Sequence, residues 1–412
     1  MRIIILGAGF GGLTALEELL DRLKPEWNVE VVLVDRHPYH LFTPLLFQVV
    51  TGGVDPGHIA HPIRWLLRSG KFQFYETEAK SIDLANKKVY LSNVELSYDF
   101  LVIGMGSATN FFGVPGAEKC AFPVKTIREA VAIKNRIIDA YRQAEMETDE
   151  AMRRCILSFA VVGGGATGVE LAASLHDLVH MVLDRDYPRV KEGETQVYLI
   201  EATNALLGGL NPKLGEIALN SLKDRGVNVQ LGCRIVGINE DGLQTADGRH
   251  IQIRTVIWAS GIKPSPLIEP LQLEKTKDGK IIVGPYLDVT KCPGVYAVGD
   301  LAAFFEPGAA RPLPATAAVA VQEGRSVGRN IAHVLHDEDQ SPFRYVFEGD
   351  LIALGRDAAV ANISGKVFNN FPAWVVWRSV HLMKVPGFRN RISVAQDWSF
   401  DYILRRDTMH LE

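Results

Sequence analysis

An α/β fold with two Rossmann-like domains and a C-terminal amphipathic helical region is predicted from three features of the sequence. The pattern G-x-G-x-x-G occurs twice, at residues 7–12 and 163–168. Each copy lies between an apolar run and a segment of helical character, which is the strand–turn–helix order of a dinucleotide-binding domain. After each copy, an acidic residue ends a second apolar run, Asp35 in VEVVLVDR and Glu201 in QVYLIEA.

The first copy of the motif has the spacing of a complete dinucleotide site. Gly7 allows the sharp turn, Gly9 lets the backbone approach a pyrophosphate, and Gly12 lets the helix pack closely on the strand. The unpaired N–H groups at the helix N-terminus then face the phosphates. Asp35 follows Gly12 by 23 residues, near the separation of about 20 expected for an acid that binds a ribose hydroxyl.

The second copy has the same glycines and a longer crossover. Gly163, Gly165 and Gly168 take the three roles, and Glu201 follows Gly168 by 33 residues. We attribute the extra length to the polar tract HDLVHMVLDRDYPRVKEGE, an extension of the crossover. A carboxylate at Glu201 accepts hydrogen bonds from both ribose hydroxyls of NADH and repels the 2′-phosphate of NADPH. No Arg or Lys in EATNALL compensates, so NADH is the expected nicotinamide.

Two dinucleotide sites predict one permanently bound redox cofactor and one nicotinamide nucleotide that binds reversibly and reacts with it. In GVYAVGDLAAF, Asp300 follows an apolar strand and Gly299. This segment resembles the second flavin-binding motif of the two-dinucleotide flavoproteins, where such an aspartate binds the ribityl chain of FAD. YDFLVIGMGSATN and RTVIWASGIKP resemble the segments that close the FAD and NAD domains. The resemblance orders the chain as FAD-binding residues 1–114, NAD-binding residues 115–268, a second FAD-binding part at 269–340 and a C-terminal region at 341–412.

Composition excludes several classes of protein. The chain has 412 residues, 47% of them hydrophobic and 22% charged, which predicts a globular protein of two or three domains. A net charge of −4 gives no general attraction to nucleic acid. The first strand begins within two residues of the start, so we expect no signal peptide. No apolar run reaches about 18 residues, so we expect no spanning helix.

The cysteines are scattered. Cys120, Cys155, Cys233 and Cys292 form no C-x-x-C pair and no Cys/His cluster, so neither a vicinal dithiol nor an iron–sulfur or other metal site is predicted. Cys120 and Cys155 leave a sulfide:quinone reductase open, because that family uses cysteines near its flavin. The third, late cysteine expected of that family is absent.

The C-terminal region carries two apolar stripes at helical spacing. The first consists of Ala373, Val376, Trp377, Val380 and Met383; after a break at VPGFRNR, the second consists of Ala395, Trp398 and Tyr402, followed by Arg405 and Arg406. We interpret the stripes as an interfacial membrane anchor, with aromatic rings at headgroup depth and cations beside lipid phosphates. The alternative is that they pack on the catalytic domains or on a second subunit.

Nearly the whole chain resembles the type II NADH:quinone oxidoreductases. The resemblance rests on ILGAGFGGL, YHLFTPLLFQVVTGGVDPGHIAHPIR, VVGGGATGVELA, GVYAVGD and KVPGFRNRISVAQDW. It implies a flavoenzyme with bound FAD that oxidises NADH, reduces a quinone and pumps no protons. It also implies a homodimer attached peripherally to the cytoplasmic face of the cell membrane.

The resemblance assigns site residues one by one. It implies FAD contacts at Gly7, Gly9, Phe10, Gly11, Gly12, Asp35, Arg36, Thr43, Pro44, Gly106, Ser107, Asp300 and Ala317. It implies NAD contacts at Gly163, Gly165, Thr167, Gly168, Glu201 and Gly261.

Three further residues are candidates for the chemistry. Glu170 matches an acid that the family places near the nicotinamide and flavin; it would orient the dinucleotide or relay protons, or simply favour a helix N-terminus. Lys384 would neutralise reduced flavin or reach the quinone, or be a cation at the membrane surface. Gln322 matches the second glutamine of the family's A-Q-x-A-x-Q stretch, but Ala318 replaces the first. A methyl group cannot hydrogen-bond a quinone carbonyl, which leaves the headgroup contact and the preferred quinone open.

Three other functions stay open at this point. They are a soluble NADH reductase for a ferredoxin or rubredoxin, a sulfide:quinone oxidoreductase, and an NADH-sensing flavoprotein of the apoptosis-inducing type.

Overall fold

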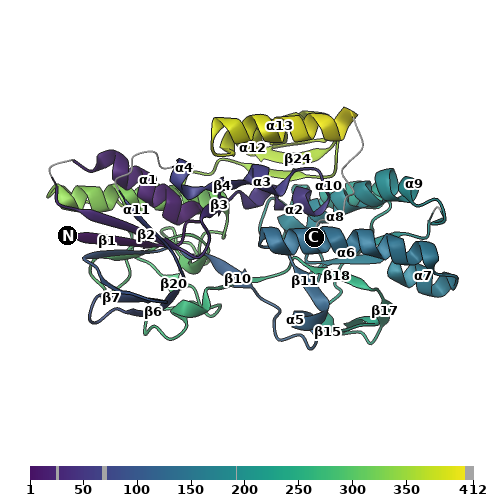
Figure 1. Cartoon of the computed structure of the whole chain (residues 1–412), viewed down its shortest axis with the longest axis horizontal. Coiled ribbons are helices and arrows are strands. Elements are labelled where there is room, and N and C mark those ends of the chain that lie inside the picture. The colour runs from purple at the N-terminus through teal and green to yellow at the C-terminus, as the bar shows by residue number, and fades with distance from the viewer. Residues whose placement is uncertain (25–26, 67–71, 192, 404–412) are drawn as a thin grey trace. The chain divides into compact units, whose positions relative to one another are not determined.

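The structure, a computed structural model, describes residues 1–24, 27–66, 72–191 and 193–403. The chain forms two compact units, each assembled from three stretches of sequence (Figure 1). Unit 1 comprises Met1–Leu41, Ala60–Ala108 and Ile262–Phe347; unit 2 comprises Phe42–Ile59, Thr109–Gly261 and the chain from Glu348 onwards. The predicted α/β class is confirmed, whereas the domain boundaries proposed from the sequence stay predictions.

Unit 1 is built around a five-stranded parallel sheet. Its strands, in the order β21-β9-β1-β2-β5, are Val295–Ala297, Phe100–Ile103, Arg2–Leu6, Glu30–Asp35 and Gln73–Glu76. The side chains of β1 are fully buried from Ile3 to Leu6, as expected of a strand covered on both faces. Because β1 lies between β2 and β9, the turn after β1 is at the point where the strand order reverses.

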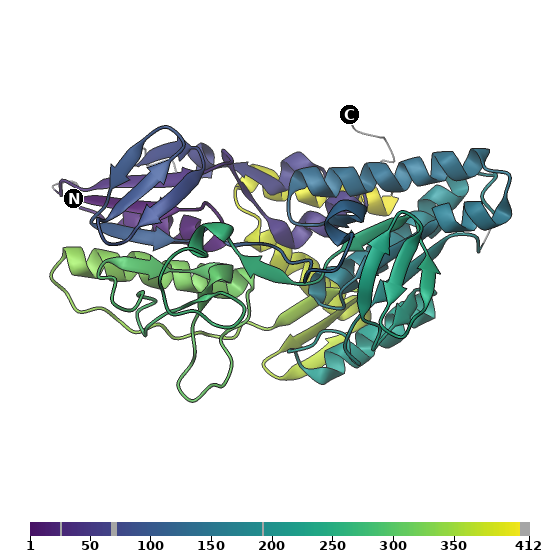
Figure 2. The same cartoon turned by 90° about the horizontal axis from the view of Figure 1, so that it is seen from below.

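Helices α1 (Phe10–Arg22) and α11 (Ala317–Leu335) pack against each other through glycines (Figures 1 and 2). A Cβ on Gly324 would lie 2.1 Å from the Gly11 carbonyl oxygen, and one on Gly328 would lie 2.5 Å from the Ala15 oxygen. Neither distance leaves room for a side chain, so the two backbones are in direct contact. This contact holds α11, from late in the sequence, against the helix that follows the first glycine turn.

The remaining elements of unit 1 are short. They are β3 (Tyr39–Leu41), β4 (Ala60–Pro62), α4 (Ile63–Leu66), β6 (Ala79–Asp83), β7 (Lys88–Leu91), β8 (Glu95–Ser97), η3 (Pro266–Ile268), β20 (Ile281–Ile282), η4 (Gly299–Leu301) and β22 (Ala302–Ala303). Two further strands, β10 (Ser107–Thr109) and β19 (Ile262–Pro264), occur where the chain leaves and re-enters unit 1.

Unit 2 contains a second five-stranded parallel sheet. Its strands, in the order β11-β18-β12-β13-β14, are Ala121–Pro123, Thr255–Trp258, Ser158–Val162, Gln196–Ile200 and Asn228–Gln230. Helix α8 (Ala166–Leu178) follows the second glycine turn and continues through a π-helical segment (Val179–Leu183) into α9 (Asp184–Asp186). The polar tract therefore extends the crossover between β12 and β13, as predicted.

Further helices and an antiparallel meander complete this part of unit 2. They are η1 (Thr43–Leu45), α2 (Leu46–Val50), α3 (Pro56–Ile59), α5 (Ala117–Cys120), α6 (Ile127–Met146), α7 (Glu150–Ile156), α10 (Pro212–Arg225), β15 (Ile235–Asn239), β16 (Gly242–Thr245) and β17 (His250–Gln252). The capping box at Thr126 and Glu129 accounts for the start of α6.

The C-terminal region contains a small sheet in addition to the predicted helices. It begins with an antiparallel sheet of β23 (Asp350–Ala353), β24 (Ala359–Ile363) and β25 (Lys366–Asn369). Helices α12 (Asn370–Lys384) and α13 (Phe388–Ile403) follow, with the predicted break between them (Figure 1). Within the described ranges, no helix is long and apolar enough to cross a membrane.

The tryptophans assigned to a membrane anchor are core residues instead. Trp377 and Trp398 are only 1% and 5% exposed, and Ala373 is fully buried. The Trp398 indole N–H donates to Gln48 Oε1 at 2.7 Å, which ties α13 to α2 within unit 2. For these three residues the alternative of packing on the rest of the protein holds, whereas Met383 and Tyr402 of the same predicted stripes are exposed. Helical spacing identifies an apolar face but not what covers that face. Arg405 and Arg406 lie outside the described residues.

Candidate functional site

The first glycine turn of unit 1 leaves an open space at the start of α1. Gly7 has φ +98°, and a Cβ there would lie 2.4 Å from the Gly104 oxygen. A Cβ on Gly12 would lie 1.9 Å from the Gly7 oxygen, whereas one on Gly9 would meet no atom closer than 4.0 Å. No side chain caps α1 and no acid lies in its first turn, so its N–H groups are available to an anion. These features fit the pyrophosphate of FAD.

Phe10, Gly11 and Arg36 lie around this turn. Gly11 is buried, and a Cβ there would lie 2.9 Å from Val298 Cγ2. The absence of a side chain at Gly11 therefore allows close packing. Phe10 is partly exposed at the first position of α1, and Arg36 is exposed directly after β2.

Asp35 is held beside the same turn. Its Oδ2 accepts a hydrogen bond from the Ala8 N–H at 2.7 Å, and its Oδ1 accepts one from the His37 N–H at 2.8 Å. The acid therefore supports the glycine turn as well as lying at the end of β2, where a ribose would be bound.

A buried histidine, which the sequence analysis did not assign, also supports the turn. His40 Nδ1 donates to the Ala8 carbonyl at 2.9 Å, and its ring meets Phe10 edge-on at 4.8 Å. Burial lowers the pKa of His40, so the ring is neutral at pH 7. Its presence in the family-like segment at residues 40–64 was the only signal in the sequence.

The carboxyl ends of β9 and β21 bring a second group of predicted FAD residues together. Ser107 Oγ donates a hydrogen bond to Asp300 Oδ2. Gly106, with φ +67°, has no atom within 4 Å of an added Cβ. Ala317 is the first residue of α11, directly after the N-cap Thr316. Thr43 and Pro44 form part of η1 in unit 2, and their predicted contact with the flavin stays a prediction.

Glu323 was missed by the sequence analysis. It is 2% exposed and accepts a hydrogen bond from the Gly299 N–H at 2.6 Å, next to Asp300. Burial, with a further contribution from Asp300, raises its pKa to about 8. A neutral carboxyl group therefore lies behind the Asp300 turn at pH 7.

The second glycine turn, in unit 2, repeats the geometry of the first. A Cβ on Gly168 would lie 1.8 Å from the Gly163 oxygen, and one on Gly165 would meet nothing within 4 Å. Helix α8 has no side-chain cap, and Thr167 is exposed in its first turn. Glu201 accepts hydrogen bonds from the Gly164 N–H at 2.6 Å and the Thr203 N–H at 2.7 Å. This arrangement fits a second dinucleotide.

Glu170 lies one turn further along α8 and is buried. Its Oε1 accepts hydrogen bonds from the Ala353 N–H at 3.0 Å and from the Trp377 indole N–H at 3.2 Å. Burial raises its pKa to about 8, so the group is protonated at pH 7. Glu170 lies beyond the first turn of α8, where an acid would favour the helix N-terminus.

Gln322 and Lys384 are both engaged with protein groups. The Gln322 amide donates from Nε2 to the Val346 carbonyl at 2.9 Å and accepts at Oε1 from the Val346 N–H at 3.0 Å. Ala318 lies one turn before it on α11, partly exposed. Lys384 is half-exposed at the end of α12 and pairs with Glu348 at 2.6 Å.

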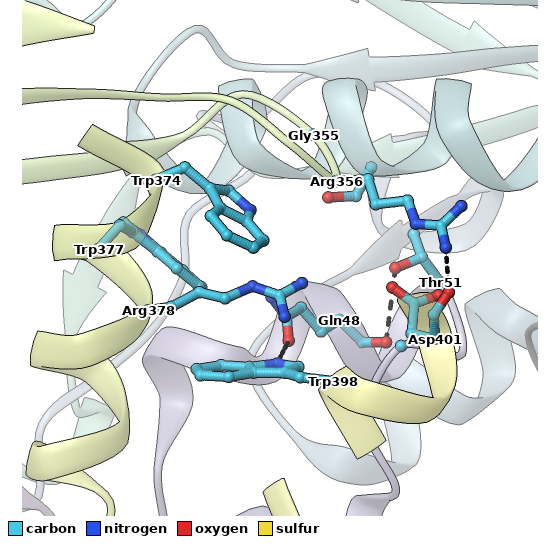
Figure 3. Close-up of a pocket in the computed structure, with 11 residues that line it drawn as sticks. Gln48, Thr51, Gly355, Arg356, Trp374, Trp377, Arg378, Trp398 and Asp401 are labelled. Atoms are coloured by element: carbon cyan, nitrogen blue, oxygen red, sulfur yellow. Dashed lines mark hydrogen bonds between the residues drawn. The ribbon is translucent and has the colours of Figure 1, made fainter. Parts of the chain in front are cut away.

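A pocket between α12, α13 and α2 contains a cation between two indoles (Figure 3). The Arg378 guanidinium lies 4.3 Å from the Trp374 ring centre and 4.9 Å from that of Trp398. The cavity has a volume of about 20 Å³, room for about one water molecule. It is too small for a nucleotide or a quinone ring, so its aromatic residues serve packing and cation–π contacts.

None of the four cysteines forms a disulfide bond in the structure. Cys120, Cys155, Cys233 and Cys292 are all free thiols. Among the residues for which positions are described, no group of three or more His, Cys, Asp or Glu could hold a metal ion.

Comparison with known proteins identifies two family models along the chain. Residues 1–324 match the model for pyridine nucleotide-disulphide oxidoreductases, and residues 347–407 match that for the NDH2 C-terminal domain. The type II NADH:quinone oxidoreductase Ndh of Mycobacterium tuberculosis is 31% identical, over 98% of this chain and 89% of that protein. The type II NADH:quinone oxidoreductase of Staphylococcus aureus is 30% identical, over 89% of this chain and 90% of that protein.

Two solved structures share the fold. NDH2 from Plasmodium falciparum, in complex with RYL-552, has a TM-score of 0.90 at 20% identity, covering 99% of each chain. The sulfide:quinone oxidoreductase of Aquifex aeolicus has a TM-score of 0.78 at 16% identity, covering 98% of this chain and 94% of that one. On these matches, and on two glycine turns that each leave an uncapped helix for a dinucleotide, the chain belongs to the pyridine nucleotide-disulphide oxidoreductases and, among them, to the type II NADH:quinone oxidoreductase family.

Proposed function

We propose that this protein is an FAD-dependent NADH:quinone oxidoreductase that pumps no protons. The observation that carries the proposal is the duplicated open glycine turn, with FAD in unit 1 and NADH in unit 2. Bound FAD would supply a ring that accepts a hydride from NADH and passes the two electrons on to the quinone. The protein residues bind and orient the nucleotide and the quinone, and they supply protons to the quinone.

Glu201 is the residue that we expect to select NADH over NADPH. Two backbone N–H groups fix its carboxylate at the end of β13. An ionised carboxylate held there accepts hydrogen bonds from ribose hydroxyls and opposes a 2′-phosphate.

Glu170 is the proposed proton donor. Quinone reduction consumes two protons, and a buried carboxyl group with a pKa of about 8 holds one at pH 7. Because Oε1 already accepts two hydrogen bonds, the proton resides on Oε2, from which it can be donated.

Binding of the quinone headgroup by Gln322 requires its amide to exchange partners. Both ends of that amide pair with the Val346 backbone. We propose that the quinone carbonyl replaces the Val346 carbonyl as the acceptor for Nε2. With Ala318 in place of the family's first glutamine, Gln322 is the one side-chain amide at this stretch.

Membrane association is assigned to two exposed stripes in place of the buried tryptophans. Phe371, Val375 and Met383 are spaced by multiples of four along α12, and Phe388, Ile392 and Phe400 are spaced in the same way along α13. Their exposed fractions run from 42% to 77%. Side chains of this kind stabilise interfacial binding by inserting into the lipid boundary. We propose peripheral attachment at the cytoplasmic face and a homodimer.

The acceptor test decides the function. We expect the purified protein to carry the visible spectrum of bound flavin, NADH to bleach it, and a short-chain quinone to restore it. A dithiol acceptor and a ferredoxin should react at least about tenfold more slowly. Fast reduction of the ferredoxin, or turnover with sulfide as donor, would assign the protein to one of the alternative classes. Negligible turnover with a long-lived reduced-flavin complex would favour the NADH-sensing class.

Glu201→Gln combined with Asn204→Arg should move the ratio of kcat/KM for NADH and NADPH towards NADPH. The change removes the repelling charge and adds a cation for the 2′-phosphate. Steady-state rates with both nucleotides measure the ratio, with Asn204→Gln as the control that adds no charge. An unchanged ratio would count against the assigned ribose contact.

Glu170→Gln should slow quinone reduction by about tenfold or more while leaving reduction of ferricyanide, which needs no proton, unchanged. In the wild type, quinone reduction should fall as the pH rises through about 8, because the carboxyl group then loses its proton. The variant should lack this fall. Equal losses with both acceptors would instead indicate a structural role.

Replacing Phe371, Phe388 and Phe400 by Ser should release the enzyme from liposomes without loss of FAD. Each ring contributes up to about 1.5–3 kcal/mol when fully buried in an apolar phase. Point changes are preferable to deleting the tail, because Trp377 and Trp398 belong to the core of unit 2. Cosedimentation measures binding, with Ser393→Ala as the control. Full binding by the triple variant would reject this surface.

A further inference from the structure

The strand order of unit 2 determines where the two halves of a bound NADH lie. β12 ends at the second glycine turn, with β13 on one side and β18 on the other. Glu201, at the end of β13, takes the adenosine ribose in the proposed function, on which this inference rests. The nicotinamide half must then pass over the carboxyl end of β18, across the point where the strand order reverses.

The carboxyl end of β18 touches the glycine turn directly. The Ala259 N–H donates to the Val162 carbonyl at 2.9 Å. A Cβ on Gly163 would lie 2.9 Å from the Ser260 Cα. The next residue, Gly261, therefore lies on the path of the nucleotide beyond the pyrophosphate.

The side chain that covers Gly261 is Phe112. A Cβ on Gly261 would lie 2.3 Å from the Phe112 Cζ, so only glycine permits this contact. The Phe112 ring is nevertheless 61% exposed. Its neighbour Phe111 differs, because that ring packs against Trp258 at 5.7 Å between centres.

Phe112 is held in a backbone conformation that is unfavourable for a bulky residue. Its φ is +52°, in the left-handed region, which is unfavourable for a residue other than glycine. Asn110 enforces the conformation. Its Oδ1 accepts from the Phe112 N–H at 2.9 Å, its N–H donates to the Gly261 carbonyl at 3.2 Å, and its carbonyl accepts from the Trp258 indole at 3.0 Å.

An exposed ring in a strained backbone contributes little to folding. Asparagine or glycine would satisfy the same turn at a lower conformational cost. Strain that surrounding hydrogen bonds maintain is typical of residues that position a ligand. Here the ring adds a flat apolar face at the nicotinamide end of the site, which a planar heterocycle can pack against.

We propose that Phe112 contacts the nicotinamide end of the bound nucleotide and positions its ring for hydride transfer. The contact is specific to that half of the molecule. It therefore separates two ligands that share the adenosine diphosphate part, NAD⁺ and ADP-ribose, because ADP-ribose lacks the nicotinamide.

The test compares Phe112→Asn with Phe112→Tyr in the FAD-loaded, full-length enzyme. Asparagine suits the left-handed backbone but has no ring, whereas tyrosine retains the ring. We expect Phe112→Asn to bind NAD⁺ about tenfold more weakly, the scale of one aromatic contact, with ADP-ribose affinity unchanged. The KM for NADH should rise by a similar factor, and Tm should stay the same or increase. Phe112→Tyr should match the wild type in all four measurements.

Three outcomes would overturn the inference: unchanged NAD⁺ affinity in Phe112→Asn, equal weakening of NAD⁺ and ADP-ribose, or a tyrosine variant that behaves like the asparagine one. Each can occur while the wild type still couples NADH oxidation to quinone reduction, so the proposed function would stand. Failure of the wild type to bind ADP-ribose would overturn the nucleotide site in unit 2, and this inference with it.

Discussion

The contact between the first and third glycines of each G-x-G-x-x-G turn is the constraint on which both sites depend. The third glycine lies against the carbonyl of the first, so closely that a Cβ would be 1.9 Å away in one turn and 1.8 Å in the other. This contact draws the helix start over the end of the strand and leaves its N–H groups without side-chain caps. Each unit thereby places the partial positive charge of a helix N-terminus at its glycine turn, which suits a pyrophosphate.

Each unit also contains a buried carboxyl group close to its predicted site. Glu323 supports the Asp300 turn in unit 1, and Glu170 lies behind the second turn in unit 2. Burial raises the pKa of each to about 8, so each is neutral at pH 7. A neutral carboxyl group costs less free energy to bury than a carboxylate does, and it holds a proton that it can donate to a substrate.

The C-terminal helices are part of unit 2. Trp377 donates to Glu170, and Trp398 donates to Gln48, so both indoles connect helices α12 and α13 to the core of unit 2. The large apolar side chains that are exposed on these helices include no tryptophan. One pair of helices therefore combines two functions: the inner side sets the environment of the proposed proton donor, and the outer side supplies the proposed membrane contact.

The sequence by itself determined the fold class, both glycine turns and their acidic partners, because these depend on local spacing within a strand–turn–helix unit. It also placed the break between the two tail helices. Only the tertiary structure decided which apolar face is buried, that Gln322 pairs with Val346, and that Asn110 and Gly261 hold Phe112 in an exposed, strained position. Those features arise from contacts between residues up to hundreds of positions apart, and periodicity carries no information about the partner across such a contact.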